Sequence, residues 1–431
     1  MTFEYGIRRN LPQFLHQLLQ VLLVGLTIGM MRTVVPALAE SEFGVPRNSF
    51  MLLTSFVVAF GFVKGVMNFL AGRLSERIGR KQVLLVGWVI AIPIPIMVWH
   101  APNWSWIVAA TVLLGINQGL TWSMTQTSKL DITLRSERGV TIGLNEFAGY
   151  AGVALAGIVT ALLAAALGPR LALLIFGLTV IGSAIVLTLL WVKDTLPWAQ
   201  AEAAAHGRNA SAHSAAQQSR PRYPQNVSAR PGTWEIFLLM SWRDRRLAAI
   251  CQAGLVEKFV DALVWVFYPL FLYRQGVALT SVGGIIGIYG FVWGAAQLVT
   301  GPLSDRVGRH RLNVLGMWVC GAGVAMMLAG VGVWWWSFSA AVAGFGMALL
   351  YPNLSAAVAD IAHPQWRGSA IGIYRFWRDL GYGIGGLGLG LVAQWSGQME
   401  VAFMFVAISM FLSGIVLAWF GEETHPGINP A

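Results

Sequence analysis

Two stretches of the 431-residue sequence decide its fold: GRLSERIGRK at Gly72–Lys81 and GPLSDRVGRH at Gly301–His310. Six of the ten positions are identical, and each stretch lies between two long apolar runs. The copies are 229 residues apart, which is more than half of the chain. A repeat at that spacing predicts that the protein is one structural unit duplicated.

The composition predicts that lipid surrounds most of the molecule. Hydrophobic residues make up 56% of the chain and charged residues 11%, whereas an ordinary soluble domain is about 25% charged. Runs of roughly 20 apolar residues, the length that a helix needs to cross a bilayer, recur along the sequence. We therefore expect an all-α integral membrane protein, because helices satisfy their own backbone polar groups in lipid.

Twelve transmembrane helices are predicted, as two bundles of six joined by a linker. The predicted spans are 14–38, 50–72, 82–100, 104–128, 140–166, 169–192, 248–273, 280–302, 312–333, 335–358, 368–394 and 399–420. The linker from about Pro197 to Gly232 is rich in Ala, Ser, Gln, Pro and Arg, which predicts disorder. After it, Trp234–Arg246 is predicted to form a short amphipathic helix on the membrane surface. The predicted domains are 1–196, the linker 197–246, and 247–431.

The distribution of Lys and Arg predicts the orientation. With the N-terminus inside, the cytoplasmic segments hold 21 of these residues and the outer loops hold three. This bias places both termini in the cytoplasm of a multi-pass cell-membrane protein, expected in a bacterial inner membrane. The net charge of +10 lies in the loops, so we expect lipid rather than nucleic acid as its partner, and a monomer.

The repeat extends beyond the two stretches. At the same offset of 229 residues, these pairs are identical: Gly61 and Gly290, Gly115 and Gly344, Asp131 and Asp360, Arg138 and Arg367, Gly139 and Gly368, Gly143 and Gly372. Six plus six spans, with G-x-L-x-[DE]-R-x-G-R-[KRH] after spans two and eight, resemble the major facilitator superfamily over essentially the whole chain. The resemblance implies a transporter rather than an enzyme, without a cofactor, in which two bundles rock about a central cavity.

The resemblance also implies a role for the repeated stretch. In the family its acidic residue caps a neighbouring span and pairs with arginine, which closes the cytoplasmic side. The second copy keeps Asp305, but the first carries the longer Glu76, which makes this latch less certain in the N-terminal half. The alternative is that these charges only anchor the topology. The predicted gate residues are Gly72, Glu76, Arg77, Arg80, Asp131, Arg138, Gly301, Asp305, Arg306, Arg309, Asp360 and Arg367.

Charged residues inside the predicted spans are the main signal for a binding site, because each costs at least about 2.5–3.5 kcal/mol on insertion. They are Arg32, Lys64, Glu146, Glu257, Lys258, Asp261, Arg375, Arg378 and Asp379. The resemblance implies that all of their spans line the cavity. Adding aromatic and amide residues on the same helical faces, the predicted cavity residues are Arg32, Lys64, Gln118, Trp122, Asn145, Tyr289, Trp293, Tyr351, Asn353, Arg375 and Arg378.

Basic groups in both halves predict a small organic anion or an amphipathic metabolite as substrate. The alternative is that these charges only pair with one another. No nucleotide-binding loop is found, so we expect coupling to protons through Glu146, Asp261 or Asp379. Alternative functions are efflux of a drug or of a toxic metal compound and, more remotely, a receptor that transports nothing. The scattered His and two Cys predict no metal site.

Overall fold

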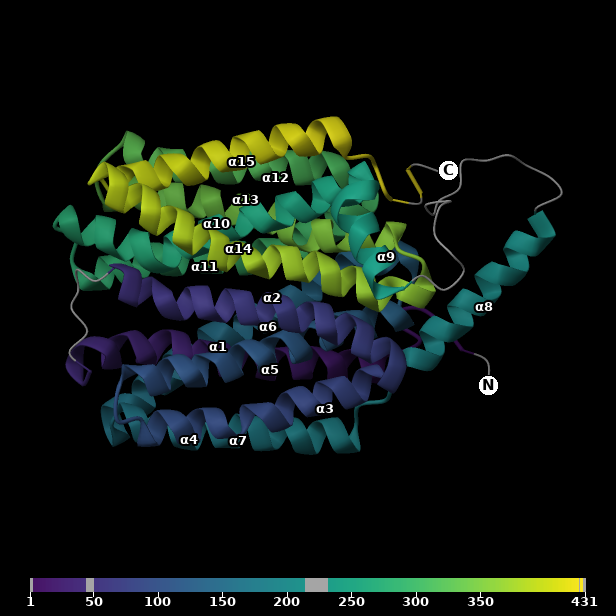
Figure 1. The fold of residues 1–431 in the computed structure, drawn as a ribbon, viewed down its shortest axis with the longest axis horizontal. Coiled ribbons are helices and arrows are strands. Elements are labelled where there is room, and N and C mark those ends of the chain that lie inside the picture. The colour runs from purple at the N-terminus through teal and green to yellow at the C-terminus, as the bar shows by residue number, and fades with distance from the viewer. Residues whose placement is uncertain (1–2, 44–49, 214–231, 426, 429–431) are drawn as a thin grey trace.

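The computed structural model describes residues 3–43, 50–213, 232–425 and 427–428, and every regular element in that part of the chain is helical. The helices run roughly parallel in two bundles (Figure 1). The first bundle contains α1 (Leu11–Ser41), α2 (Phe50–Ile78), α3 (Arg80–Ala91), α4 (Pro93–His100), α5 (Trp104–Ile132), α6 (Arg138–Leu167) and α7 (Pro169–Leu190). The second contains α10 (Arg245–Arg274), α11 (Leu279–Val307), α12 (His310–Ala329), α13 (Val333–Ile361), α14 (Arg367–Ser396) and α15 (Glu400–Phe420).

These helices confirm the predicted fold class and its twelve spans. The third span is divided into α3 and α4 at Pro93, because proline cannot donate its backbone hydrogen bond. Within the described residues, ten spans are long and apolar enough to cross a membrane by composition alone. The other two, α10 and α14, are each 30 residues long but more polar, since they carry six of the buried charges considered below.

Two equivalent seams join the bundles: α14 packs along α2, and α11 packs along α6. The 229-residue repeat relates one seam to the other. Glycines allow this close approach, since a Cβ atom on Gly72 would lie 2.5 Å from the Gly368 carbonyl oxygen. At the equivalent position, a Cβ on Gly301 would lie 2.5 Å from the carbonyl oxygen of Gly139. Backbone therefore meets backbone in both seams.

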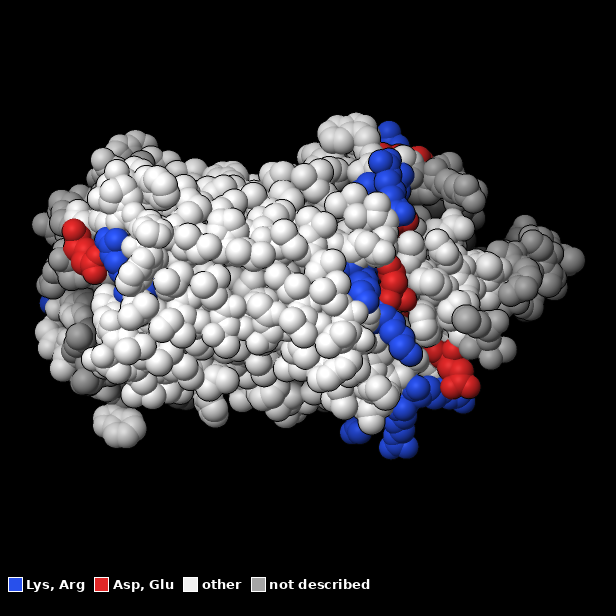
Figure 2. Space-filling model, turned by 90° about the horizontal axis from the view of Figure 1, so that it is seen from below, with Lys and Arg blue, Asp and Glu red and all other residues white. Residues whose placement is uncertain are grey.

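Both repeated stretches lie at one end of the bundles, which we call the motif end. Each turns sharply at a glycine with positive φ, 99° at Gly79 and 95° at Gly308, a conformation that disfavours side chains. On the face shown in Figure 2, charged side chains gather at the two ends, mostly at the motif end, and leave a broad uncharged band between them. Such a band fits a lipid environment.

The linker differs from the prediction. The stretch from about Pro197 is predicted to be disordered, but Leu196–His213 forms helix α8, which extends beyond the bundles at the motif end (Figure 1). Ala is the strongest helix former, and the α8 sequence LPWAQAEAAAHGRNASAH is rich in it. The rest of the predicted disorder, at 214–231, lies outside the described residues.

The predicted amphipathic segment consists of α9 (Thr233–Leu238) followed by the π-turn η2 (Leu239–Arg243). Phe237 and Met240 are buried, whereas Trp234 and Trp242 are 65% and 60% exposed. Exposed tryptophans beside a buried apolar face are typical of a segment at a membrane interface.

Candidate functional site

Eight of the nine charged residues predicted inside the spans have buried side chains, and none of these eight is more than 4% exposed. They come from α2, α6, α10 and α14: Lys64, Glu146, Glu257, Lys258, Asp261, Arg375, Arg378 and Asp379. Arg32 belongs to α1, but its side chain lies outside the described residues. Charges buried at this depth require opposite charges or hydrogen-bond partners, so their contacts define the site.

Asp379 of α14 joins the two bundles. Its Oδ2 accepts a 2.6 Å hydrogen bond from Asn68 Nδ2 of α2 and lies 3.4 Å from Lys64 Nζ. Its Oδ1 accepts from Arg378 Nε at 3.2 Å. The carboxylate therefore holds one cation from each bundle, and Ser123 of α5 fixes Asn68 through a 2.7 Å bond to Oδ1.

Arg375 makes a second contact between the bundles. Its Nη1 donates to Gln126 Oε1 of α5 at 2.8 Å, while its Nε and Nη2 find no hydrogen-bond partner within the described part of the chain. The same is true of Nη1 and Nη2 of Arg378, whose guanidinium lies 4.5 Å from the Tyr351 ring centre. Four buried guanidinium nitrogens are thus able to donate to a ligand.

Asp261 of α10 binds three side chains of the C-terminal half. It accepts hydrogen bonds from Tyr382 at 2.8 Å and Tyr289 at 3.0 Å, and it pairs with Lys258 Nζ at 2.6 Å. The Lys258 ammonium lies 4.3 Å from the ring centre of Tyr351. Cation–π contacts of this kind stabilise a charge away from water.

Aromatic rings cover the space between the two halves. Tyr150 of α6 lies 4.1 Å, between ring centres, from Trp293 of α11 and 6.0 Å from Tyr351 of α13. Trp122 of α5 lies 5.8 Å from Tyr150, and its Nε1 donates to Glu146 Oε1 at 3.0 Å. The rings form an apolar wall beside the charged groups.

Three amide residues predicted to line the cavity, Asn145, Gln118 and Asn353, differ from one another in what they bind. Asn145 donates to Glu146 Oε1 at 2.8 Å, and the second oxygen of Glu146 has no partner among the described residues. Gln118 bonds back to the Val24 carbonyl of α1 at 3.1 Å. Asn353 donates to the Leu349 carbonyl of its own helix at 2.7 Å. The structure thus brings Asn145 to the cluster but turns the amide nitrogens of Gln118 and Asn353 toward backbone.

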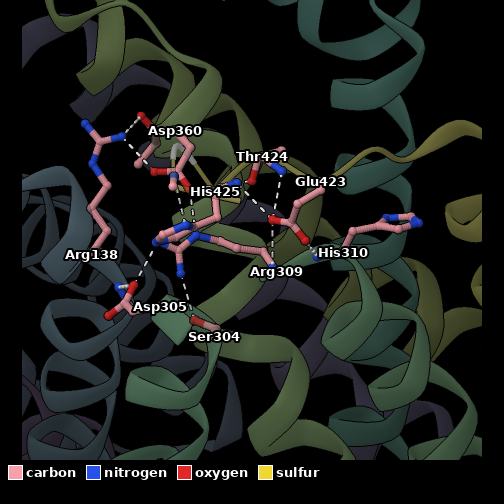
Figure 3. Close-up of polar contacts among 12 residues, drawn as sticks. Arg138, Ser304, Asp305, Arg309, His310, Asp360, Glu423, Thr424 and His425 are labelled. Atoms are coloured by element: carbon pink, nitrogen blue, oxygen red, sulfur yellow. Dashed lines mark hydrogen bonds and ion pairs between the residues drawn. The ribbon is translucent and has the colours of Figure 1, made fainter. Parts of the chain in front are cut away.

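The motif end carries the same polar network twice. In the first half, Arg80 donates to Asp131 at 2.9 Å; in the second, Arg309 donates to Asp360 at 2.6 Å (Figure 3). The backbone N–H groups of the two arginines donate to Asp194 at 3.1 Å and Glu423 at 2.9 Å, respectively. Thr195 and Thr424 complete the networks through bonds to Asp131 and Asp360.

Two carboxylates of the repeated stretches bridge the bundles. Glu76 accepts from Ser369 N–H in the first turn of α14 at 2.7 Å. Asp305 accepts from the N–H groups of Gly139 and Val140 in the first turn of α6, both at 2.9 Å. Carboxylates at helix N-termini bind otherwise unpaired donors. These bonds, including the one from the longer Glu76, join the two bundles at the motif end.

Arg138 and Arg367 occupy equivalent positions in the repeat but bind different partners. Arg138 donates to Asp360 across the bundle boundary at 2.9 Å. Arg367 lies 3.9 Å from Asp131 and donates to Glu202 of α8 at 2.8 Å. Burial alone would raise the pKa of Glu202, but Arg367, Arg138 and Arg135 outweigh it and lower that pKa. The Glu202 carboxylate therefore attaches helix α8 to the motif end.

The remaining predicted gate residues, Arg77 and Arg306, are exposed and form no ion pair with any described residue. Arg77 instead lines a pocket of about 410 Å³ together with Arg73 and Gln200. The predictions omitted Asp194, Glu202 and Glu423. The repeat could have found two of these, because Asp194–Thr195 and Glu423–Thr424 also lie 229 residues apart.

Comparison with known sequences gives a consistent match. The family profile described as Major Facilitator Superfamily matches residues 18–257 and 250–431. An uncharacterized MFS-type transporter of Salmonella typhimurium is 23% identical over 410 residues, which cover 91% of this chain and 92% of that protein. A probable 4-methylmuconolactone transporter of Cupriavidus pinatubonensis is 24% identical over 353 residues, which cover 80% of this chain and 77% of the relative.

Solved structures share the fold. The human organic anion transporter MFSD10 superposes with a TM-score of 0.76 at 17% identity, covering 95% of this chain and 99% of its own. The proton:xylose symporter XylE superposes with a TM-score of 0.71 at 16% identity, covering 96% and 97%, respectively. Identities this low show a common fold and nothing about the ligand.

Proposed function

This chain belongs to the Major Facilitator Superfamily, and from that premise we propose that it is a proton-coupled secondary transporter of a small organic anion, working by alternating access. The bundles at 1–196 and 247–431 are the moving parts, and 197–246 is their cytoplasmic linker. The protein acts as a monomer in the cell membrane, with both termini and the motif end in the cytoplasm.

The observation that carries this proposal is the set of four unpartnered guanidinium nitrogens on Arg375 and Arg378, counted among the described residues. Leaving a buried donor unpaired costs about 1–3 kcal/mol. A carboxylate can accept two parallel hydrogen bonds from one guanidinium, which makes it the group that best satisfies these donors. The rings of Tyr150, Trp293 and Tyr351 would contact the apolar part of the same molecule.

The name of one relative supports an organic substrate. It is described as a probable 4-methylmuconolactone transporter, which favours an organic molecule over a metal compound. The solved structures, an organic anion transporter and a proton:xylose symporter, share only the fold and do not bear on the substrate of this chain.

The bonds at the motif end support alternating access. In the described conformation, Glu76, Asp305 and Arg138 each bind the opposite bundle. In our proposal this is the state closed to the cytoplasm, and the anion enters from outside. Release into the cytoplasm requires all three contacts to break. The proton is carried by a carboxylate of the buried cluster, which includes the three candidates predicted from the sequence, Glu146, Asp261 and Asp379.

Ligand binding to the purified full-length protein tests the substrate class. We propose thermal unfolding with 4-hydroxybenzoate and with its uncharged analogue 4-hydroxybenzamide, followed by lactone and aliphatic carboxylates with their amides. The carboxylates should raise the unfolding temperature by mass action, the amides should not, and Arg375→Gln/Arg378→Gln should abolish the effect. Stabilisation by the amides alone, or equal stabilisation of the double variant, would refute the anion site.

A further inference from the structure

Glu257 of α10 is the most isolated of the buried charges that the structure describes. Its side chain is 0% exposed, and neither carboxylate oxygen has a hydrogen-bond partner among the described residues. By contrast, Asp261 and Asp379 each accept from several groups, and Glu146 keeps one bonded oxygen. An ionised carboxylate without partners is so unfavourable in a buried site that the group takes up a proton instead.

Arg378 is the complementary group on the facing helix α14. Its Nε is bound to Asp379, while its two terminal nitrogens are unpartnered within the described chain. The helices that carry Glu257 and Arg378, α10 and α14, pack against each other, but no hydrogen bond or ion pair joins the two side chains in this conformation. Two opposite charges, each with unsatisfied atoms, thus lie on packed helices without being paired.

Tyr374 connects the turns that carry these two residues. Its ring lies 5.9 Å from the Arg378 guanidinium, one helical turn away on α14. On α10, a Cβ atom at Gly254, one turn before Glu257, would lie 3.2 Å from the Tyr374 hydroxyl oxygen. That hydroxyl likewise has no partner among the described residues. Tyr374 therefore lies between the helical turns that carry Glu257 and Arg378.

Other titratable groups surround Glu257 from the packed helices. Those in its electrostatic surroundings are Lys258 and Asp261 on α10, Arg378, Asp379 and Tyr374 on α14, and Cys320 on α12. More distant ones on the packed helices are Tyr289 on α11, Tyr351 on α13 and Lys64 on α2, which contact Asp261, Arg378 and Asp379. Lys258 is already paired with Asp261. Arg378 has two terminal nitrogens without a partner among the described residues, so it is the cation able to bind the Glu257 carboxylate.

We propose that Glu257 carries the transported proton and that Arg378 exchanges partners between the substrate anion and the Glu257 carboxylate. This inference rests on the proposed function. With the outer side open, Glu257 is neutral and Arg378 binds the anion. Once the anion leaves to the cytoplasm, the Glu257 O–H bond breaks, the proton passes to cytoplasmic water, and the carboxylate pairs with Arg378. Throughout the cycle Asp379 anchors Arg378 through Nε.

This exchange of partners implies that one proton is transported with each anionic group, so a monovalent anion is transported without net charge. The exchange also gives the two carboxylates different roles. Asp379 positions Arg378, whereas Glu257 gains and loses the proton. Replacing Glu257 by Gln mimics the neutral form, so anion binding and exchange should persist while the proton gradient loses its effect.

Infrared difference spectroscopy on the reconstituted full-length protein tests the proton without a substrate. At pH 6, the spectrum of wild type minus that of Glu257→Gln should contain the C=O stretch of a protonated buried carboxyl, and this band should shift in heavy water. The control variant is Glu400→Gln, which changes the first turn of α15. The spectrum of wild type minus that of Glu400→Gln should lack the band. Absence of the band in the first difference, or its loss in Glu146→Gln instead, would overturn the assignment. Arg378→Gln provides a second variant, in which the band should persist to higher pH than in wild type.

Transport of labelled 4-hydroxybenzoate into proteoliposomes tests the coupling, with protein-free liposomes as the blank. Glu257→Gln should lose accumulation driven by an inward proton gradient and keep at least half of the wild-type exchange rate, and Glu400→Gln should keep both. Gradient-driven accumulation by Glu257→Gln would overturn the coupling. If wild type neither binds nor transports any carboxylate of the thermal-unfolding series, the proposed function fails, whereas the infrared result still decides the protonation of Glu257.

Discussion

Glu202 of α8 accepts a 2.8 Å hydrogen bond from Arg367 at the start of α14, and it lies 3.6 Å from Arg135 of the opposite bundle. A carboxylate from the linker thus contacts arginines of both halves at the motif end. Arg138 binds Asp360 of the other bundle directly, whereas the equivalent Arg367 binds Glu202 of the linker helix, so the two halves of the repeat differ in their contacts with the linker.

Glu202→Gln should loosen α8 and the gate together. The substitution removes charge-assisted bonds worth about 1.5–3 kcal/mol but keeps the side-chain shape. A nitroxide at Gln200→Cys, an exposed position, should give a more mobile electron paramagnetic resonance spectrum in Glu202→Gln. The matched control is Glu235→Gln, which removes a carboxylate from α9. An unchanged spectrum in Glu202→Gln would show that α8 is held by other contacts.

The docking of α8 should depend on acid pH. The pKa of Glu202 is lowered below an unfolded value of about 4.3, so its stabilisation is fully present above that value. It is lost as the pH falls through the lowered folded pKa. The nitroxide spectrum should therefore be constant from pH 8 to about 5 and become mobile below about 4. Glu202→Gln should remove this transition. Mobility that increases instead with rising pH would contradict the sign of the effect.

Asp379→Asn should destabilise the protein more than Lys64→Gln. The first change leaves Lys64 and Arg378 buried without their shared carboxylate, and breaking such a site costs about 3–5 kcal/mol. The second leaves Asp379 still bound by Arg378 and Asn68, and should cost about 1–3 kcal/mol. Thermal unfolding in detergent measures both. The opposite order would mean that Lys64, rather than Arg378, is the principal partner of Asp379.

Gly301→Ala should open the motif end. The added Cβ would lie 2.5 Å from the Gly139 carbonyl oxygen, so α11 and α6 would have to separate. Spin labels at Arg77→Cys and Arg306→Cys, both exposed, should report a longer distance in this variant. Gly287→Ala on the same helix is the control, because no described atom lies within 4 Å of its Cβ position. An unchanged distance in Gly301→Ala would show that the seam is not tightly packed.

The helices were predictable because the lengths of the apolar runs and the duplicated stretch specify them. Helices α10 and α14 are more polar, but the repeat requires a helix at each of these positions. Helix α8 was missed since its composition resembles that of a disordered linker. Its docking depends on Glu202, a long-range contact that local sequence does not encode.

The charged residue types of the candidate site were also visible in the sequence, but their pairing was not. Nothing in the sequence distinguishes Asp379, which is bonded to three groups, from Glu257, which is bonded to none of the described ones. Likewise, Gln118 shares a helical face with Trp122, yet its amide turns to the α1 backbone. Side-chain rotamers and helix packing determine which partner each buried polar group binds, so these partners could be identified only from the structure.

The central claim is that Arg375 and Arg378 bind an organic anion whose uptake is driven by protons. Its most direct test is the accumulation of labelled 4-hydroxybenzoate in proteoliposomes with an inward proton gradient, after subtraction of protein-free liposomes. Wild type should accumulate the anion above equilibrium, and Arg375→Gln/Arg378→Gln should lose at least nine-tenths of that accumulation. Accumulation by the double variant equal to that of wild type would contradict the account.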